Sequence, residues 1–213
     1  MPSIEFFFEL ASPYSYLASL RIERVAEEAA RRLDWCPIDL DVVWSAQGVL
    51  EAYSAVRQLK RSYIAKDSRR CAEALGVSLS RPVTSSRDTK LAKLAYRGLL
   101  GTDRALAERF IRAVWHAHFR DGVPIGTTQD LAAATAGLGL TREAIDSASS
   151  APLAHEAQAE ANSRAIATGC FGVPWFVADG EVFFGHDRLS HLASHLQRRS
   201  DASGPHVRPP AAP

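Results

Sequence analysis

Ser12 and Ser15 are the residues from which chemistry is most readily argued in this sequence. They stand three residues apart in Ser12-Pro13-Tyr14-Ser15, directly after an apolar run. Serine is a preferred N-cap and proline is favoured at the first helical position, so this stretch predicts a helix start. The unpaired N–H groups and positive dipole end of such a start favour an anion, including a thiolate. Ser12 could therefore simply cap the helix, or donate its hydroxyl to a thiolate that arrives on a ligand.

The three cysteines, Cys36, Cys71 and Cys170, do not extend this site into a redox centre. A serine hydroxyl has no disulfide chemistry and the sequence has no C-x-x-C motif, so dithiol exchange at Ser12 and Ser15 is excluded. The odd number and wide spacing of the cysteines argue against a disulfide framework, and no Cys/His pair has zinc-ligand spacing. We expect three reduced thiols and no metal site.

The first elements of the chain must position Ser12. Residues 4–10 form a short aromatic run that predicts a buried strand. Residues 13–32 have the apolar spacing of an amphipathic helix, and residues 35–44 resemble a second strand, with Pro37 marking an edge or bulge near its start. Strand, helix and strand at this spacing predict a βαβ unit with parallel strands.

The rest of the chain divides into a helical block and a short β-rich end. We expect helices over residues 58–75, 89–99, 103–119, 128–136, 142–147 and 154–168, with Asp88 and Thr128 as caps. Residues 173–178 and 181–184 predict two strands joined by a hairpin turn at Asp179-Gly180, followed by a helix over 187–197. The proline-rich residues 200–213 are predicted to be disordered.

Together these elements predict an α/β fold, a thioredoxin-like mixed sheet with an inserted all-α domain. Residues 1–48 and 170–199 would form the discontinuous thioredoxin-like domain, residues 49–169 the helical insertion, and residues 200–213 the tail. Thioredoxin-like folds place their active centre after the first strand, facing a proline that is usually cis. Ser12 and Pro174 occupy those two places.

Four motifs in chain order connect the sequence with a known family. Residues 8–16 read Phe-Glu-Leu-Ala-Ser-Pro-Tyr-Ser-Tyr, and residues 165–177 read Ala-x-x-x-Gly-Cys-Phe-Gly-Val-Pro-Trp-Phe-Val. Residues 184–189 read Phe-Gly-His-Asp-Arg-Leu. The remaining motif consists of Lys60, Tyr63, Asp67 and Arg70, followed by Ala72 and Gly76. Over residues 4–197 the chain resembles 2-hydroxychromene-2-carboxylate isomerases and kappa-class glutathione transferases, which belong to the DsbA-like branch of the thioredoxin fold.

The resemblance implies glutathione as cofactor. Ser12 would lie beside the glutathione sulfur. The backbone of Val173, ahead of a cis Pro174, would pair with the tripeptide as one strand pairs with another. His186 and Asp187, at a helix start, would hold the charged γ-glutamyl end.

Lys60 and Asp187 also have plain structural interpretations. By resemblance, Lys60 would lie near a carboxylate of the ligand or substrate, but Lys60 and Arg70 also fit a solvated helix face. Asp187 could serve as the N-cap of the last helix, with or without a role in binding.

The sequence departs from the family pattern at three places. Family members often carry an asparagine that contacts glutathione, followed by two prolines, ahead of the lysine; residues 47–53 contain neither. His186 stands where glutamine or serine is more usual. Trp175 follows Pro174 where a smaller residue is typical, and an indole there could narrow the pocket.

The leading hypothesis is a glutathione-dependent isomerase that interconverts 2-hydroxychromene-2-carboxylate and trans-o-hydroxybenzylidenepyruvate. Reversible thiolate addition would allow the double bond of the substrate to rotate, which requires a held thiolate, a polarised carbonyl or carboxylate and exclusion of water. Ser12 would hold the thiolate and Lys60 is the candidate for polarisation. The aromatic wall would come from Tyr14, Tyr16, Trp44 or Trp175. Alternatives are a kappa-like glutathione transferase acting on another electrophile and a non-catalytic thioredoxin-like binding module.

Composition limits the partners of this 213-residue chain. Lys and Arg number 25 and Asp and Glu 24, a net charge of +1, which offers no electrostatic footprint for nucleic acid or an anionic membrane. No apolar stretch is long enough to span a bilayer, and the N-terminus lacks the features of a signal peptide. We therefore expect a cytoplasmic protein with a small aromatic substrate, and the resemblance implies a homodimer.

Overall fold

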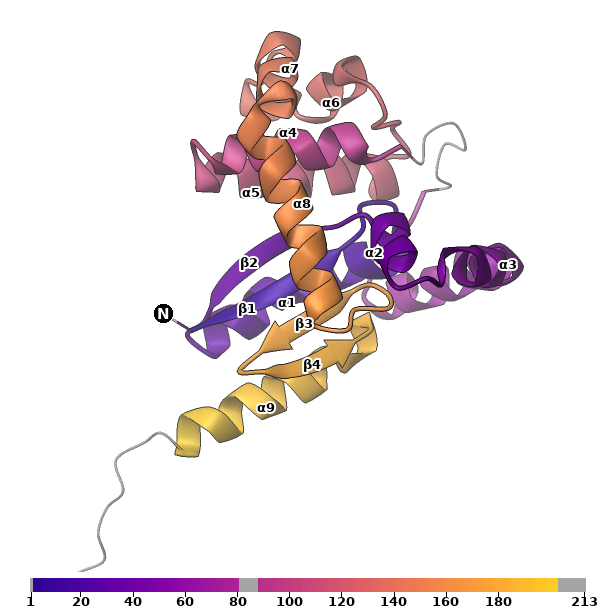
Figure 1. Cartoon of the computed structure of the whole chain (residues 1–213), viewed down its shortest axis with the longest axis vertical. Helices are drawn as coiled ribbons and strands as arrows, with labels where there is room; N and C mark the ends of the chain where they lie inside the picture. The colour runs from indigo at the N-terminus through magenta and orange to yellow at the C-terminus, as the bar shows by residue number, and fades with distance from the viewer. Residues whose placement is uncertain (1, 81–87, 203–213) are drawn as a thin grey trace, which may run out of the picture.

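The computed structural model describes residues 2–80 and 88–202, in which a mixed sheet and a group of helices are built from interleaved parts of the chain (Figure 1). The strands are β1 (Ser3–Phe8), β2 (Arg32–Pro37), β3 (Trp175–Ala178) and β4 (Glu181–Phe184). The α-helices are α1 (Pro13–Glu28), α2 (Leu40–Ala46), α3 (Leu50–Ala74), α4 (Lys90–Leu100), α5 (Arg104–Trp115), α6 (Thr128–Ala134), α7 (Arg142–Ser150), α8 (Pro152–Ala167) and α9 (Leu189–Ala202). A π-helix, η1 (His116–Arg120), and two 3-10 helices, η2 (Ala136–Leu138) and η3 (His186–Arg188), complete the described elements.

The sheet has the strand order β2-β1-β3-β4. β1 pairs with β2 in parallel and with β3 antiparallel, and β3 pairs antiparallel with β4. The parallel pair is connected by α1, as the βαβ prediction required. The helices α2 to α8 are inserted between β2 and β3, so the predicted thioredoxin-like sheet with an all-α insertion is confirmed. The insertion boundaries at residues 49 and 169 stay predictions.

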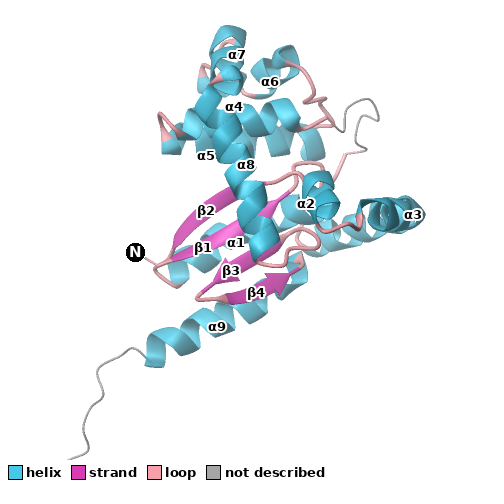
Figure 2. Cartoon of the chain, in the orientation of Figure 1, coloured by secondary structure: helices cyan, strands magenta, loops and turns pink. Residues whose placement is uncertain are grey.

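Alternation along β1 determines which helices cover which face of the sheet. Ile4, Phe6 and Phe8 are fully buried in a core that also contains side chains of α1, α4, α5 and α9. Phe7 points the other way, into a second cluster with Trp175 and side chains of α8. Figure 2 shows the result: α8 crosses one face of the sheet, and α1 and α9 lie against the other.

The insertion packs against the sheet beside β2, where α4 to α7 gather into one helical group (Figure 1). Tyr96 of α4 is buried and donates its hydroxyl to the carbonyl of Trp35 at 3.0 Å. Trp115 of α5 donates its indole N–H to the carbonyl of Leu10 at 3.1 Å, at the turn that precedes Ser12. The helical group therefore contacts the predicted active-centre turn directly.

The strand predicted over residues 35–44 is wrong in its second half. β2 ends at Pro37, and residues 40–46 form α2. From Ile38 to Val42 apolar residues alternate with Asp39 and Asp41, which resembles a strand, but Val43 and Trp44 are adjacent positions that bury one side of a short helix. Pro37 closes the strand instead of opening it, although β2 is an edge strand as the proline suggested.

Several other boundaries differ from the predictions. α1 ends at Glu28 before Ala30, whose φ of 51° ends the helix. α3 begins at Leu50, eight residues before the predicted start at 58. The helix predicted over 103–119 passes into the π-helix η1 after residue 115. Thr127, instead of Thr128, caps α6, in a capping box with Asp130.

The C-terminal region also differs from its prediction. β3 begins at Trp175 instead of residue 173, and a 3-10 turn precedes α9. α9 continues to residue 202, so the first three residues of the predicted disordered tail are helical. Residues 203–213 lie outside the described residues. No helix within residues 2–80 and 88–202 is long and apolar enough to cross a membrane.

Candidate active site

Ser12 lies at the turn between β1 and α1 and serves as the N-cap of that helix. Its φ of −87° and ψ of 116° are typical of a cap, and its Oγ accepts a hydrogen bond from the N–H of Ser15 at 3.2 Å. The N–H of Ser12 donates to the carbonyl of Glu9 at 2.9 Å, which closes the turn. Ser12 is half-buried. The capping bond uses the Ser12 oxygen only as an acceptor, so the hydroxyl hydrogen can still be donated to a ligand. Ser12 can therefore cap the helix and also donate to a thiolate.

Ser15 differs from Ser12 in its environment. Its side chain is fully buried, and its Oγ has no hydrogen-bond partner among the described residues. A ligand that approaches from solvent would therefore meet Ser12 and not Ser15.

Pro174 lies at the same end of the sheet as the Ser12 turn. The register pairs Phe7 with Trp175, so the next residues along both strands lead toward the Ser12 turn. The Val173–Pro174 peptide bond is cis, as the fold prediction expected. The N–H and the C=O of half-buried Val173 form no hydrogen bond within the described part of the chain. This short segment can pair with an extended peptide.

Tyr14 connects the first turn of α1 with α3. Its hydroxyl donates to Oδ2 of Asp67 at 2.8 Å, and Tyr63 donates to Oδ1 of the same carboxylate at 3.3 Å. Burial and the bond to Asp67 raise the pKa of Tyr14 above its ordinary value, and the Tyr14 bond in turn lowers the pKa of Asp67. Asp67 also forms an ion pair with Arg70 at 3.5 Å. Three residues of the α3 motif, Tyr63, Asp67 and Arg70, therefore form one hydrogen-bonded group with this tyrosine.

His186, which is distant from Tyr14 in the sequence, stacks on the ring of this tyrosine. The rings of Tyr14 and His186 are 5.3 Å apart and 3° from parallel. Partial burial lowers the pKa of His186, which favours a neutral imidazole at pH 7. The neighbouring Asp187 is exposed and pairs with Arg188 at 2.9 Å, and it lies in η3, two residues before the start of α9. η3 is thus held against the Ser12 end of α1.

Lys60 is exposed on α3 and has no charged partner within the described residues. It lies seven residues before Asp67, which is about two helical turns and about 10 Å along the axis, on the same face of α3. Since Asp67 contacts Tyr14, this face of α3 leads toward the Ser12 turn. Lys60 is accessible to an anionic ligand, but no contact in the structure connects it to Ser12.

Three of the four predicted aromatic residues are buried, and two of these, Tyr16 and Trp175, pack in the core clusters. Tyr16 is buried, stacks on Phe119 at 5.1 Å and forms a hydrogen bond of 3.2 Å with Nδ1 of His116. Trp175 is buried in the α8 cluster and donates to Oγ1 of Thr168 at 3.2 Å. Its packing against α8 follows from the strand register, which places it opposite Phe7.

Trp44 contacts the loop that precedes Pro174. It is buried on α2 and donates its indole N–H to the carbonyl of Phe171 at 3.0 Å. Arg57 lies over its ring at 5.1 Å from the centroid. Phe171 is 41% exposed, which leaves an aromatic surface beside the loop.

Sequence reasoning missed the structural role of Gln47. This residue stands in the stretch that lacks the family asparagine, yet its Nε2 donates to the carbonyl of Cys170 at 2.9 Å. Gln47 and Trp44 together attach the end of α2 to the loop that leads to Pro174.

The cysteines of the chain are poorly suited to supply a thiolate. Burial raises the pKa of Cys36 to about 11 and that of Cys170 to about 12, and both side chains are buried. Partial burial and the adjacent Asp67 also raise the pKa of Cys71. At neutral pH all three stay protonated, so a thiolate at Ser12 would have to come from a ligand.

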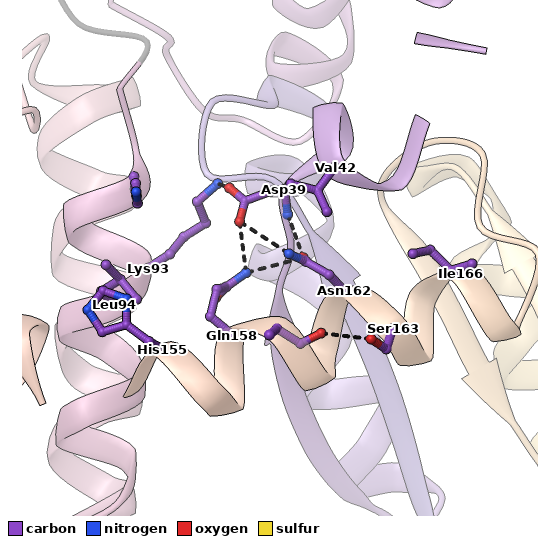
Figure 3. Close-up of a pocket in the computed structure, with 11 residues that line it drawn as sticks. Asp39, Val42, Lys93, Leu94, His155, Gln158, Asn162, Ser163 and Ile166 are labelled. Carbon is purple, nitrogen blue, oxygen red and sulfur yellow. Dashed lines mark hydrogen bonds and ion pairs between the residues drawn. The ribbon is translucent and has the colours of Figure 1, made fainter. Parts of the chain in front are cut away.

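A separate cavity of about 400 Å³ lies between α2, α4 and α8 (Figure 3). Its polar lining includes Asp39, Lys93, Gln158 and Asn162, and none of the residues predicted for the active site lines it. No group of three His, Cys, Asp or Glu side chains in the described residues could hold a metal ion.

The fold and the Ser12 turn define a thioredoxin-like protein in which serines stand at positions 12 and 15, at the start of the helix that follows the first strand. The family model for the DSBA-like thioredoxin domain matches residues 3–197. The chain therefore belongs to the DsbA-like thioredoxin domain family.

Named relatives match almost the whole chain. A 2-hydroxychromene-2-carboxylate isomerase from Sphingobium xenophagum is 27% identical over 195 residues, covering 91% of this chain and 97% of the relative. A glutathione S-transferase kappa 2 from Caenorhabditis elegans is 28% identical over 211 residues and covers 91% of each chain. Among solved structures, a 2-hydroxychromene-2-carboxylate isomerase is similar with a TM-score of 0.79 at 26% identity, covering 94% of this chain and 99% of that chain.

Proposed function

We propose that the protein is a glutathione-dependent isomerase that interconverts 2-hydroxychromene-2-carboxylate and trans-o-hydroxybenzylidenepyruvate in aromatic hydrocarbon degradation. The observation that carries this proposal is the Ser12 turn, a helix N-terminus with a hydroxyl hydrogen free to be donated. The isomerase relatives support the reaction. The kappa-class relative supports glutathione as the source of the thiol.

The groups around the turn fit glutathione. The hydroxyl of Ser12 and the N–H of Tyr14, which has no hydrogen-bond partner among the described residues, suit a thiolate. The free backbone groups of Val173 suit an extended peptide. The carboxylate of Asp187 and the ammonium of Lys60 are exposed, with opposite charges that match the amino and carboxylate ends of the tripeptide.

Each residue then has a task in the reaction. Bound glutathione would supply the thiolate that adds reversibly to the substrate double bond. Ser12 donates its hydroxyl to the sulfur, and the positive end of α1 favours the ionised thiol. Lys60 provides a positive charge for a carboxylate of glutathione or of the substrate. The stacked rings of Tyr14 and His186 form a flat aromatic wall that excludes water and suits a planar substrate.

Two measurements test this proposal. Millimolar glutathione should raise the melting temperature of the wild type, because a ligand that binds only the folded state stabilises it. The absence of any shift would refute both glutathione-dependent functions and favour a binding module. Conversion of 2-hydroxychromene-2-carboxylate, followed by absorbance, should require glutathione.

A glutathione transferase is the second candidate function, favoured by the kappa-class relative. The same Ser12 turn would then hold the thiolate for an irreversible attack on another electrophile. Stable glutathione conjugates detected by mass spectrometry, without isomerisation of the chromene carboxylate, would favour this function. We further propose a cytoplasmic homodimer, which size-exclusion chromatography with light scattering and fractionation of the native host would test.

A further inference from the structure

Lys93 of α4 places a buried ammonium behind the Ser12 turn. Its side chain is 3% exposed, and its Nζ contacts both carboxylate oxygens of Glu9, at 3.1 and 3.2 Å. The same nitrogen also forms a short contact with Asp39 and donates to the carbonyl of Ile38 at 3.3 Å. One cation thus joins the end of β1, the start of α2 and the inserted helices.

The branch through Glu9 leads to Ser12. Glu9 opens the turn that Ser12 closes, since its carbonyl accepts the Ser12 N–H at 2.9 Å. Thr89, just before α4, donates to Oε1 of Glu9 at 2.7 Å. The side chain of Glu9 is therefore fixed by α4 while its backbone fixes the catalytic turn.

The branch through Asp39 leads to the other side of the site. Asp39 stands at the start of α2, and its carboxylate also accepts bonds from Gln158 at 3.3 Å and Asn162 at 3.4 Å of α8 (Figure 3). At the other end of α2, Trp44 and Gln47 donate to the loop ahead of Pro174. The position of α2 consequently sets the position of that loop.

We infer that Lys93 is a positioning residue that fixes the Ser12 turn relative to the loop before Pro174. The inference rests on the proposed function, in which both segments hold one ligand. A buried ammonium retained between two carboxylates specifies geometry strongly, because any shift of either segment leaves a buried charge unpaired. Through the contacts of Lys93, the helical insertion determines the distance between the Ser12 turn and the loop before Pro174.

The test compares Lys93→Met with Arg31→Met. Arg31 forms a similarly buried ion pair with Asp179, at 2.8 Å, beyond the far end of β1, where Ile4 pairs with Ala178. Both substitutions should lower the melting temperature. Only Lys93→Met should lower kcat, by about 10²-fold, the typical effect of a small misplacement of reacting groups. Arg31→Met should keep its activity within about two-fold at temperatures at which both variants are folded, because the Arg31–Asp179 pair is distant from the reacting groups.

Two charge-neutralising variants keep the inference testable if Lys93→Met does not fold. Glu9→Gln and Asp39→Asn preserve shape and remove one branch each. Hydrogen exchange should quicken over residues 9–16 in Glu9→Gln and over residues 168–174 in Asp39→Asn. Unchanged exchange in both segments, with unchanged kcat, would overturn the inference. Because exchange is measured without glutathione, it remains informative if the wild type does not bind glutathione, an outcome that would refute only the proposed function.

Discussion

The hydroxyl of Tyr14 donates a 2.8 Å hydrogen bond to the carboxylate of Asp67, 53 residues further along the chain. This bond connects the first turn of α1 to α3, a helix that extends from the rest of the molecule and buries only Ser68 and Ala72 along its length (Figure 1). Since Lys60 lies on the same face of α3, the bond also helps determine where that lysine is presented.

The Tyr14–Asp67 bond predicts a pH dependence of stability. The bond lowers the pKa of Asp67, so its contribution is fully present above the ordinary aspartate pKa of about 3.9 and is lost as the pH falls through the lower folded value. Tyr14→Phe keeps the ring on His186 and removes the hydroxyl. Urea unfolding from pH 7 to pH 2.5 should show wild type more stable than Tyr14→Phe at neutral pH, with the difference shrinking in acid. A difference that is constant over this range would contradict the assignment.

Lys60→Ala should weaken glutathione binding while leaving the fold intact. Lys60 is exposed and solvated, so its removal costs little stability, whereas a lost hydrogen bond to a charged ligand typically costs about ten-fold in affinity. The neighbouring Arg61→Ala is the control, since Arg61 is equally exposed and one position further round α3. Calorimetric titration with glutathione measures both. Equal dissociation constants for the two variants would show that Lys60 does not bind glutathione.

The N-terminal βαβ unit and the hairpin could be predicted because their signals are local. Ser12-Pro13 specifies a helix start and Asp179-Gly180 specifies a tight turn, whatever packs around them. The strand over 35–44 failed because the alternation of apolar and acidic residues from Ile38 to Val42 imitates the period of a strand, whereas the packing of Val43 with side chains of α8 favours a helix.

Residues that act through long-range partners were harder to find. Nothing in the local sequence distinguishes Lys93 from other helical lysines, because its partners Glu9 and Asp39 are distant in the chain. Gln47 stands where the family asparagine is missing, and its bond to the Cys170 carbonyl depends on a loop 123 residues away. Trp175 was proposed as a pocket wall because it follows Pro174, whereas the register turns it toward α8.

The thiols of the chain should react in a defined order. Cys36 and Cys170 are buried and their pKa values are raised to about 11 and 12, while Cys71 is only partly buried. In the native protein at pH 8, a thiol reagent should modify one cysteine, slowly, and all three after unfolding. Cys71→Ser should abolish the native reaction. Rapid modification of two or more thiols in the folded wild type would contradict this accessibility.

Gly98 should be required for the packing of the insertion. A Cβ at this position of α4 would lie 2.0 Å from the backbone carbonyl oxygen of Ala148 in α7. Gly98→Ala should therefore force the helices apart and cost about 1–3 kcal/mol, typical of overpacking. Gly101→Ala is the matched control, because a Cβ there meets nothing closer than 3.4 Å. Equal unfolding free energies for these two variants would show that α4 and α7 separate at no cost.

Ser12→Ala should lower turnover by about 10²-fold or more, because one donor to a developing charge is typically worth 10²–10³ in rate. The substitution also removes a helix cap, which costs about 1 kcal/mol of stability. Thr127→Ala separates the two effects, since Thr127 caps α6 by the same kind of bond, to the N–H of Asp130. Both variants should melt earlier than wild type. If turnover falls only in Ser12→Ala, the hydroxyl acts on the thiolate; if turnover is unchanged, Ser12 is a cap and nothing more.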